Sequence, residues 1–278
     1  MDDASTDRTP ELIAEYVRRD PRIISVRNPQ NMRLPASLNL GFRRSKGTYL
    51  TWTSDDNIMR PQMLSELVAF CEANPQYGFV CSDWTVMDEE GKTITQHKAG
   101  PQEGLIYWNN IGPCFLYRRW VYDKVGEYED ALFCAEDYDY FLRILAVTEM
   151  AFIQRDLYMY RVHSGSLSAT CSQQARLAAL EARRRAVHFL RAGGKKDLAA
   201  RCALGVAEEA AEVYGRAELW KALRVAIICA PGLVLRSGIG RHVLAACFLG
   251  RGLRRKLHTT YLRVLKPDYW QNTRARQE

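Results

Sequence analysis

The chain has 278 residues, of which 47% are hydrophobic and 26% charged, and its formal net charge is +7. A chain of this length can bury one large core or two modest ones. No stretch reaches the roughly 18 uncharged apolar residues that a membrane-spanning helix needs. The acidic, polar N-terminus lacks the features of a secretory signal. The sequence therefore predicts a protein with neither a transmembrane helix nor a secretory signal.

Charge is distributed unevenly along the chain. Residues 1–171 carry a net charge of −6 and residues 172–278 a net charge of +13. The basic part could face anionic lipid or nucleic acid, but the base-reading elements of known nucleic-acid modules are absent, so nucleic acid is not expected as a partner. Eight cysteines are scattered without a C-x-x-C pair, which predicts a reduced, cytosolic setting.

In chain order, short strand patterns alternate with helix patterns after a polar turn at residues 2–7. We expect helices over 9–19, 34–45 and 61–73, strands over 22–26, 47–52 and 78–82, and a hairpin turn at 88–91. This alternation predicts an α/β layered domain with a mostly parallel sheet. In such sheets ligands bind beyond the carboxyl ends of the strands.

Two adjacent acids, Asp55 and Asp56, follow the strand pattern at residues 47–52. Hard oxygen ligands suit Mg²⁺ or Mn²⁺, which proteins hold with one or two carboxylates together with substrate phosphates. Acids at this position can also simply cap the following segment. The pair is therefore a candidate metal site, and other residues of the chain must support that interpretation.

From about residue 172 the composition changes to Ala, Arg, Leu and Glu with helical periodicity. Residues 222–235 and 239–249 are apolar stretches, and the basic run RGLRRK follows at 251–256. These helices could lie on an anionic membrane surface. Alternatively, they are ordinary helices that pack on each other or on the first part of the chain.

Several ordered segments of residues 1–168 resemble the family 2 glycosyltransferases. The family's D-D-x-S-x-D-x-T loop is similar to DDASTDRT at 2–9, and its A-x-N-x-G stretch resembles residues 36–50. SDD at 54–56 stands where the family has its DXD-type metal motif. AEDYDY at 135–140 looks like its E-D-x-D acceptor segment, and YRVHSGSLS at 160–168 resembles its Y-R-x-H-x-x-S-x-S ending.

The resemblance implies an A-type nucleotide-diphospho-sugar transferase fold and a nucleotide-sugar donor bound with Mn²⁺ or Mg²⁺. It implies that Asp56 is the direct metal ligand, with Asp55 and His163 completing the site. Asp3 would lie by the nucleobase and Asp55 near the ribose, and Asn39 belongs to the same donor-binding set. For His163, a loop histidine that is merely hydrogen-bonded is an equal alternative.

By the same resemblance, Asp137 is the general base of an inverting transfer to a glycan or glycolipid acceptor, and Glu136 assists it. Such a base takes the proton of the acceptor hydroxyl as that oxygen attacks the anomeric carbon. The alternative is that Asp137 and Asp139 only cap the helix that follows. Aromatic residues within 107–112 could contact an acceptor sugar or belong to the core.

The resemblance divides the chain into a catalytic domain at 1–168 and a basic helical region at 169–278. It also predicts that the first strand and helix of the family's domain are missing, because the Asp-Asp loop opens the chain. The competing hypotheses are a non-catalytic remnant or interaction protein, and a sugar nucleotidyltransferase. What the family commonly does implies the assembly of a surface polysaccharide or glycolipid. The scattered cysteines predict a cytoplasmic protein, and the basic helical region could place it on the inner face of the plasma membrane.

Overall fold

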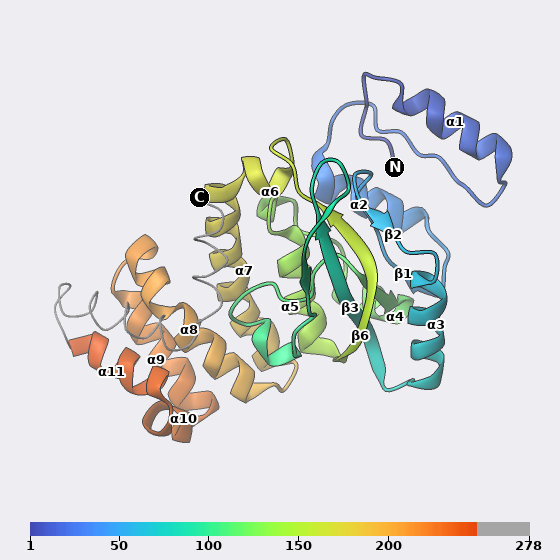
Figure 1. The fold of residues 1–278 in the computed structure, drawn as a ribbon. Helices are drawn as coiled ribbons and strands as arrows, with labels where there is room; N and C mark the ends of the chain where they lie inside the picture. Colours follow the sequence, from blue (N-terminus) through green and yellow to red (C-terminus); the bar gives the residue numbers. More distant parts are fainter. Residues whose placement is uncertain (249–278) are drawn as a thin grey trace. The chain divides into compact units, whose positions relative to one another are not determined.

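The computed structural model of this protein describes residues 1–248. These residues divide into a first unit that ends at Ala182 and a second that begins at Arg183. The first unit contains a six-stranded sheet with helices on its faces, and the second is helical (Figure 1). The predicted α/β domain followed by an α-helical region is confirmed.

The strands of the first unit are β1 Tyr49–Leu50, β2 Ile58–Met59, β3 Tyr77–Met87, β4 Thr93–His97, β5 Phe115–Arg118 and β6 Glu149–Arg161. They are ordered β1-β5-β3-β6-β2, and β4 pairs with β3. The long strands β3 and β6 run through the middle of the unit (Figure 1).

The sheet is mixed rather than mostly parallel, which corrects one detail of the expected fold. Among the described strands, β3 and β6 form the parallel pair, and the other pairings are antiparallel. The chain between β3 and β6 contains two helices, and such a crossover is what a parallel pairing requires. A hydrogen bond from the Asp88 N–H to the Lys92 carbonyl, 3.0 Å long, closes the turn between β3 and β4. A turn this short can join two paired strands only when they are antiparallel.

The predicted strand over residues 22–26 is wrong. In its place, a single parallel bridge joins Asp2 to Arg27, and Ile24 remains 76% exposed. A β-branched sequence forms a strand only where a neighbouring strand accepts its hydrogen bonds and packs its side chains. Among the described residues, the only strand-like pairing of this part of the chain is the single bridge between Asp2 and Arg27.

The helices that begin in the first unit include the three with predicted bounds. They are α1 Thr9–Arg19, α2 Arg33–Arg44, α3 Met63–Ala73, α4 Arg119–Val125, α5 Glu136–Val147, α6 Leu167–Thr170 and α7 Ser172–Ala192, which continues into the second unit, with 3₁₀ turns η1 Gln102–Gly104 and η2 Asp130–Leu132. Helix α1 has no buried residue and projects away from the sheet (Figure 1). The expected helices at 9–19, 34–45 and 61–73 are confirmed as α1, α2 and α3.

Each face of the sheet has its own core. Val80 and Leu116 pack with Met63 and Leu67 of α3 on one face. Because side chains alternate along a strand, their neighbours Phe79, Phe115 and Tyr117 face the other side. There the Phe79 and Phe115 rings meet Phe141 of α5 at 5.5 and 5.0 Å. Helix α5, which begins at Glu136, is thus fixed against the middle of the sheet.

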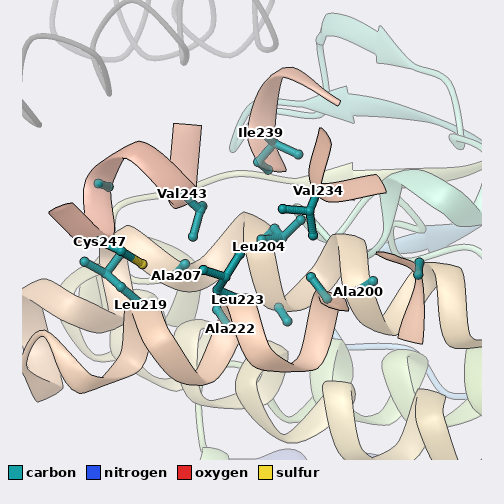
Figure 2. Close-up of a cluster of buried hydrophobic side chains, with 14 residues drawn as sticks. Ala200, Leu204, Ala207, Leu219, Ala222, Leu223, Val234, Ile239, Val243 and Cys247 are labelled. Carbon is teal, nitrogen blue, oxygen red and sulfur yellow. The ribbon is translucent and has the colours of Figure 1, made fainter. Parts of the chain in front are cut away.

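The second unit packs its helices around one core that is rich in alanine. They are α8 Lys196–Tyr214, α9 Ala217–Cys229, α10 Pro231–Arg236 and α11 Gly238–Phe248. Leu204, Leu223, Val234 and Val243 meet in this core with several alanines (Figure 2), and small side chains let helices approach closely. Part of the apolar stretch at 222–235 is therefore used internally, whereas Ile227, Ile228 and Leu235 stay exposed.

No helix among residues 1–248 has the length and apolar character to span a bilayer. The basic run at 251–256 lies outside the described residues. Contact of this region with an anionic membrane surface stays a prediction.

Candidate active site at the end of the central strands

The acid pair lies in a loop that follows β1 and is tied to the neighbouring strands. The Thr51 hydroxyl donates to the Phe115 carbonyl at 2.7 Å, and the hydroxyls of Thr53 and Tyr158 share a 2.6 Å hydrogen bond. The first contact anchors the loop to β5, and the second anchors it to β6. The loop's acids are therefore held at the edge of the sheet where the family resemblance predicts the donor site.

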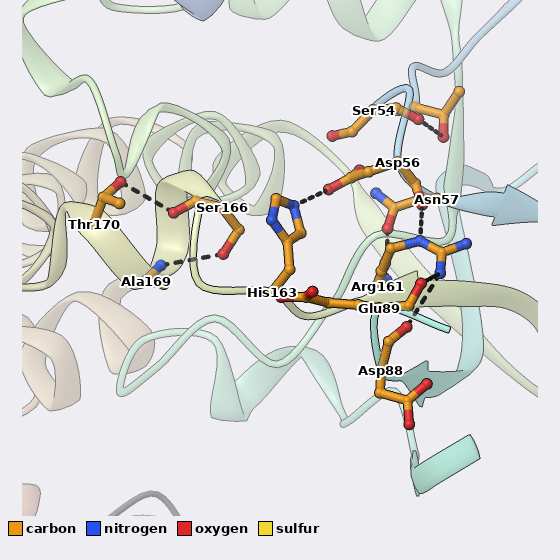
Figure 3. Close-up of polar contacts among 11 residues, drawn as sticks. Ser54, Asp56, Asn57, Asp88, Glu89, Arg161, His163, Ser166, Ala169 and Thr170 are labelled. Atoms are coloured by element: carbon orange, nitrogen blue, oxygen red, sulfur yellow. Dashed lines mark hydrogen bonds and ion pairs between the residues drawn. The ribbon is translucent and has the colours of Figure 1, made fainter. Parts of the chain in front are cut away.

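Asp56 and His163 meet although 107 positions separate them. His163 Nε2 lies 3.2 Å from Asp56 Oδ2 (Figure 3), and both side chains are about 30% exposed. The second oxygen, Asp56 Oδ1, is buried without a hydrogen-bond partner among the described residues. A buried oxygen without a donor is costly unless a ligand satisfies it, so this carboxylate is suited to a cation.

Arg161 fixes the acid loop from the end of β6, just before His163. Its Nε donates to the Asp56 carbonyl at 2.9 Å, and its backbone N–H donates to Asn57 Oδ1 at 2.8 Å. Its Nη1 also donates to the carbonyls of Asp88 and Glu89 in the β3–β4 hairpin (Figure 3). The sequence shows an Arg-x-His pattern here, but only its histidine was predicted to take part in the site.

The protein side chains alone do not complete a metal centre in the described part of the chain. No group of three or more His, Cys, Asp and Glu side chains within residues 1–248 is arranged to hold a metal ion. Asp55 is exposed next to Asp56. The arrangement offers two close ligands, Asp56 and His163, and a second acid nearby, Asp55. Substrate phosphates usually complete such an incomplete protein shell.

Asp137 lies in the first turn of α5, with each carboxylate oxygen held by a donor. Oδ1 accepts the Tyr138 N–H at 2.6 Å, and Oδ2 accepts the Asn109 amide at 3.0 Å. Burial raises the pKa of Asp137, and these two hydrogen bonds offset part of that shift. The contact with Asn109 was not predicted, because only the aromatic residues of 107–112 were expected to contact an acceptor.

Glu136, beside Asp137, is a buried carboxyl whose Oε2 has no partner among the described residues. Burial and the neighbouring charge of Asp137 raise the pKa of Glu136 to about 7, from its usual 4.5. Two adjacent carboxyls in different environments are suited to different protonation states, as acid–base sites require.

We expect Glu136→Gln to flatten the pH dependence of the unfolding free energy between about 4.5 and 7. Because the folded pKa is raised, the folded wild type binds more protons than the unfolded chain in this window. Its stability is therefore full below pH 4.5 and falls as the pH rises through 7, by at most about 3 kcal/mol. The neutral amide has no such loss. Urea unfolding at pH 5 to 8 measures the slope. Exposed Glu103→Gln is the control and should keep the wild-type slope, while a wild-type slope in Glu136→Gln would contradict the assignment.

Asp3 and Asn39 are both engaged within the protein. Asp3 Oδ1 accepts the Asn28 side-chain amide at 2.7 Å and the Met32 N–H at 2.8 Å. Buried Asn39 exchanges two hydrogen bonds with the backbone of Tyr128, at 2.7 and 2.9 Å. In this structure, Asn39 therefore holds the loop before α5, and Asp3 holds the segment that leads into α2. A role for either residue in donor binding stays a prediction.

Solved structures with this fold include nucleotide-sugar enzymes. S. aureus TarS 1–349 in complex with UDP-GlcNAc superposes with a TM-score of 0.65 at 13% identity, covering 94% of this chain and 81% of that one. The mannosyltransferase PcManGT of Pyrobaculum calidifontis, in complex with GDP-Man and Mn²⁺, gives 0.54 at 16% identity, covering 99% and 73%. The first unit thus has the A-type glycosyltransferase fold.

Sequence comparison points to one family. The model of glycosyl transferase family 2 matches residues 1–133, slightly under half of the 278-residue chain, and this part of the chain is similar to that family. An uncharacterized glycosyltransferase of Haemophilus influenzae is 30% identical over 152 residues, which are 52% of this chain and 50% of the relative. The putative glycosyltransferase EpsE of Bacillus subtilis is 36% identical over 91 residues, 32% of this chain and 33% of that protein. The chain thus spans about half the length of the first relative and a third of the second.

Proposed function

We propose that the protein is an inverting glycosyltransferase that moves a sugar from a nucleotide-diphosphate donor to an acceptor hydroxyl. The observation that carries this proposal is the contact between Asp56 and His163, with Asp56 Oδ1 buried and unpaired beside it. Solved neighbours in complex with UDP-GlcNAc and with GDP-Man and Mn²⁺ support a nucleotide-sugar donor and a divalent cation.

In this proposal Asp56 and His163 would hold Mn²⁺ or Mg²⁺ together with the donor diphosphate, and Asp55 would lie nearer the ribose. The bound cation neutralises the negative charge of the diphosphate leaving group. Arg161 contributes by fixing the carbonyl of Asp56 and the side chain of Asn57. That anchoring keeps the carboxylate oriented before the donor binds, which is the role of supporting residues around metal sites.

Asp137 serves as the general base. Its carboxylate accepts the proton of the acceptor hydroxyl while that oxygen forms the new bond to the anomeric carbon and the diphosphate departs. Asn109 and the Tyr138 N–H fix the two oxygens, and the raised pKa increases the affinity of the carboxylate for the incoming proton. Glu136 lies next to it and contacts the acceptor or orients Asp137. A glycan or a glycolipid is the proposed acceptor class.

The test compares wild type with Asp56→Asn in donor and metal binding. UDP- and GDP-sugars are titrated with Mn²⁺, with Mg²⁺ and with EDTA, and Mn²⁺ binding is followed separately by electron paramagnetic resonance. We expect Asp56→Asn to weaken Mn²⁺-dependent donor binding by about 10–100-fold or more, because even supporting residues at metal sites contribute that much. The exposed hairpin acid change Glu90→Gln is the control and should bind as wild type does.

Two results would overturn the proposal. A folded wild type that binds none of the nucleotide sugars favours the non-catalytic alternative. Equal metal-dependent binding by wild type and Asp56→Asn shows that the cation lies elsewhere.

A further inference from the structure

A cavity of about 570 Å³ lies between the segment around η2 and the first half of α7. This volume is within the range of small-molecule sites, which combine apolar walls with a few polar groups. The apolar side chains lining it include Phe133, Leu177 and Ala178, and the polar ones include Gln173, Gln174 and Glu181. From Gln173 to Glu181 the helix rises about 12 Å, which exceeds one sugar ring.

One wall of this cavity leads into the segment that carries the proposed base. Phe133, in that wall, precedes Glu136 and Asp137 of α5 by three and four positions. The cavity therefore adjoins the segment that carries Glu136 and Asp137. It shares no lining residue with the acid loop at Asp55 and Asp56.

Arg33 is not itself a lining residue of the cavity, but it places a positive charge over the ring of Phe133, which is one. Its guanidinium carbon lies 5.3 Å from the centre of the Phe133 ring. Arg33 is exposed, and no ion pair joins it to an acid among the described residues. Its φ is +69°, in the left-handed region that side chains other than glycine rarely adopt. Residues held in such strained conformations cluster at ligand-binding sites. Cys134, next to Phe133, has a φ of +74°.

We propose that this cavity is the acceptor subsite and that its ligand is a carbohydrate carrying a phosphate or carboxylate. The inference rests on the proposed transfer function and specifies its acceptor. The sugar ring packs on Phe133 and Leu177, its hydroxyls bond the amides of Gln173 and Gln174, and its anionic group pairs with Arg33. Glu181 lies at the opposite end of the α7 lining from the two amides, which leaves one end of the cavity free of negative charge.

The test compares two probes that differ in a single phosphate group, N-acetylglucosamine and N-acetylglucosamine 6-phosphate, by ligand-observed NMR titration. We expect wild type to bind the phosphorylated probe about tenfold or more tightly, since hydrogen bonds to charged groups are the stronger class. Arg33→Gly should abolish this preference and leave the neutral probe unchanged. Glycine also suits the φ of +69°, so misfolding does not explain the loss. Arg33→Lys should keep part of the preference.

A second variant tests the cavity itself. Leu177→Trp fills it and should weaken both probes about tenfold or more, whereas Leu12→Trp, at an equally exposed leucine of α1, should weaken neither. Nucleotide-sugar binding should be unchanged in all four variants. Equal wild-type affinity for the two probes, a preference that survives Arg33→Gly, or a loss of donor rather than probe binding in Arg33→Gly would overturn the proposal. A wild type that binds no donor would instead contradict the proposed function, since probe binding needs no turnover.

Discussion

Asp137→Asn is expected to lower the rate of sugar transfer by about 10²–10⁴-fold, the usual contribution of a general base. The amide keeps the size of the carboxylate and an oxygen that accepts the Tyr138 N–H, which lies 2.6 Å from Asp137 Oδ1. It cannot take a proton from an acceptor hydroxyl at neutral pH. Donor affinity and thermal stability should therefore stay near wild type while the catalytic rate falls. Product formation under saturating donor measures the effect.

The matched control is Asp123→Asn, an exposed acid of α4. It removes the same charge from a position that makes no proposed contact with substrate, so it should keep wild-type activity. Asn109→Ala is informative as well, because it removes the amide that donates to Asp137 Oδ2 at 3.0 Å without removing the carboxylate. It should give a smaller loss than Asp137→Asn. Activity of Asp137→Asn within a few-fold of wild type would show that another group accepts the proton.

Local sequence patterns predicted the elements whose formation depends on local physics. Periodic apolar residues and a proline in the first turn located α1 at Thr9–Arg19. The acidic turn at Asp88 located the β3–β4 hairpin, whose loop is closed by bonds within itself. The strand expected at 22–26 was wrong because strand formation depends on a partner, and no local pattern reports whether one is present.

Sheet direction and site geometry depend on residues distant in sequence, so local patterns could not supply them. That β5 runs antiparallel to β3 follows from packing and pairing, not from either strand's own composition. The meeting of Asp56 with His163 was anticipated only through the family resemblance. The hydrogen bond from Arg161 to the Asp56 carbonyl and the one from Asn109 to Asp137 were not predicted, because each joins segments far apart in sequence. A polar residue in a loop gives no sign of its partner until the fold is known.

Arg143→Ala is expected to lower the unfolding free energy by about 3–5 kcal/mol, the usual result when one partner of a buried ion pair is removed. Arg143 of α5 is 10% exposed and its partner Asp139 is 1% exposed, with Nε and Oδ2 2.8 Å apart. The same guanidinium donates to the carbonyls of Val125 and Glu127 at 3.0 and 2.8 Å. Its loss leaves a buried carboxylate without its cation and two carbonyls without a donor.

A nearby arginine offers a matched control, because Arg43 also binds Glu127, through the exposed carboxylate at 2.6 Å. Arg43→Ala breaks a surface pair and should cost about 0–1 kcal/mol. Urea unfolding followed by tryptophan fluorescence measures both variants. The double variant Asp139→Leu, Arg143→Met removes both buried charges and should recover much of the lost stability. Equal small costs for Arg143→Ala and Arg43→Ala, or no recovery in the double variant, would contradict the buried-charge explanation.

The same ion pair bears on activity through the loop that precedes α5. Arg143 holds the carbonyl of Glu127, and the next residue, Tyr128, stacks on Tyr140 with ring centres 4.0 Å apart. The Tyr128 hydroxyl accepts the Trp52 indole N–H at 3.1 Å, which connects this loop to the strand end that precedes Asp55 and Asp56. Where Arg143→Ala still folds, donor affinity should therefore fall together with the transfer rate, whereas Asp137→Asn should lower the rate alone. That difference separates a residue that positions both halves of the site from one that takes the proton.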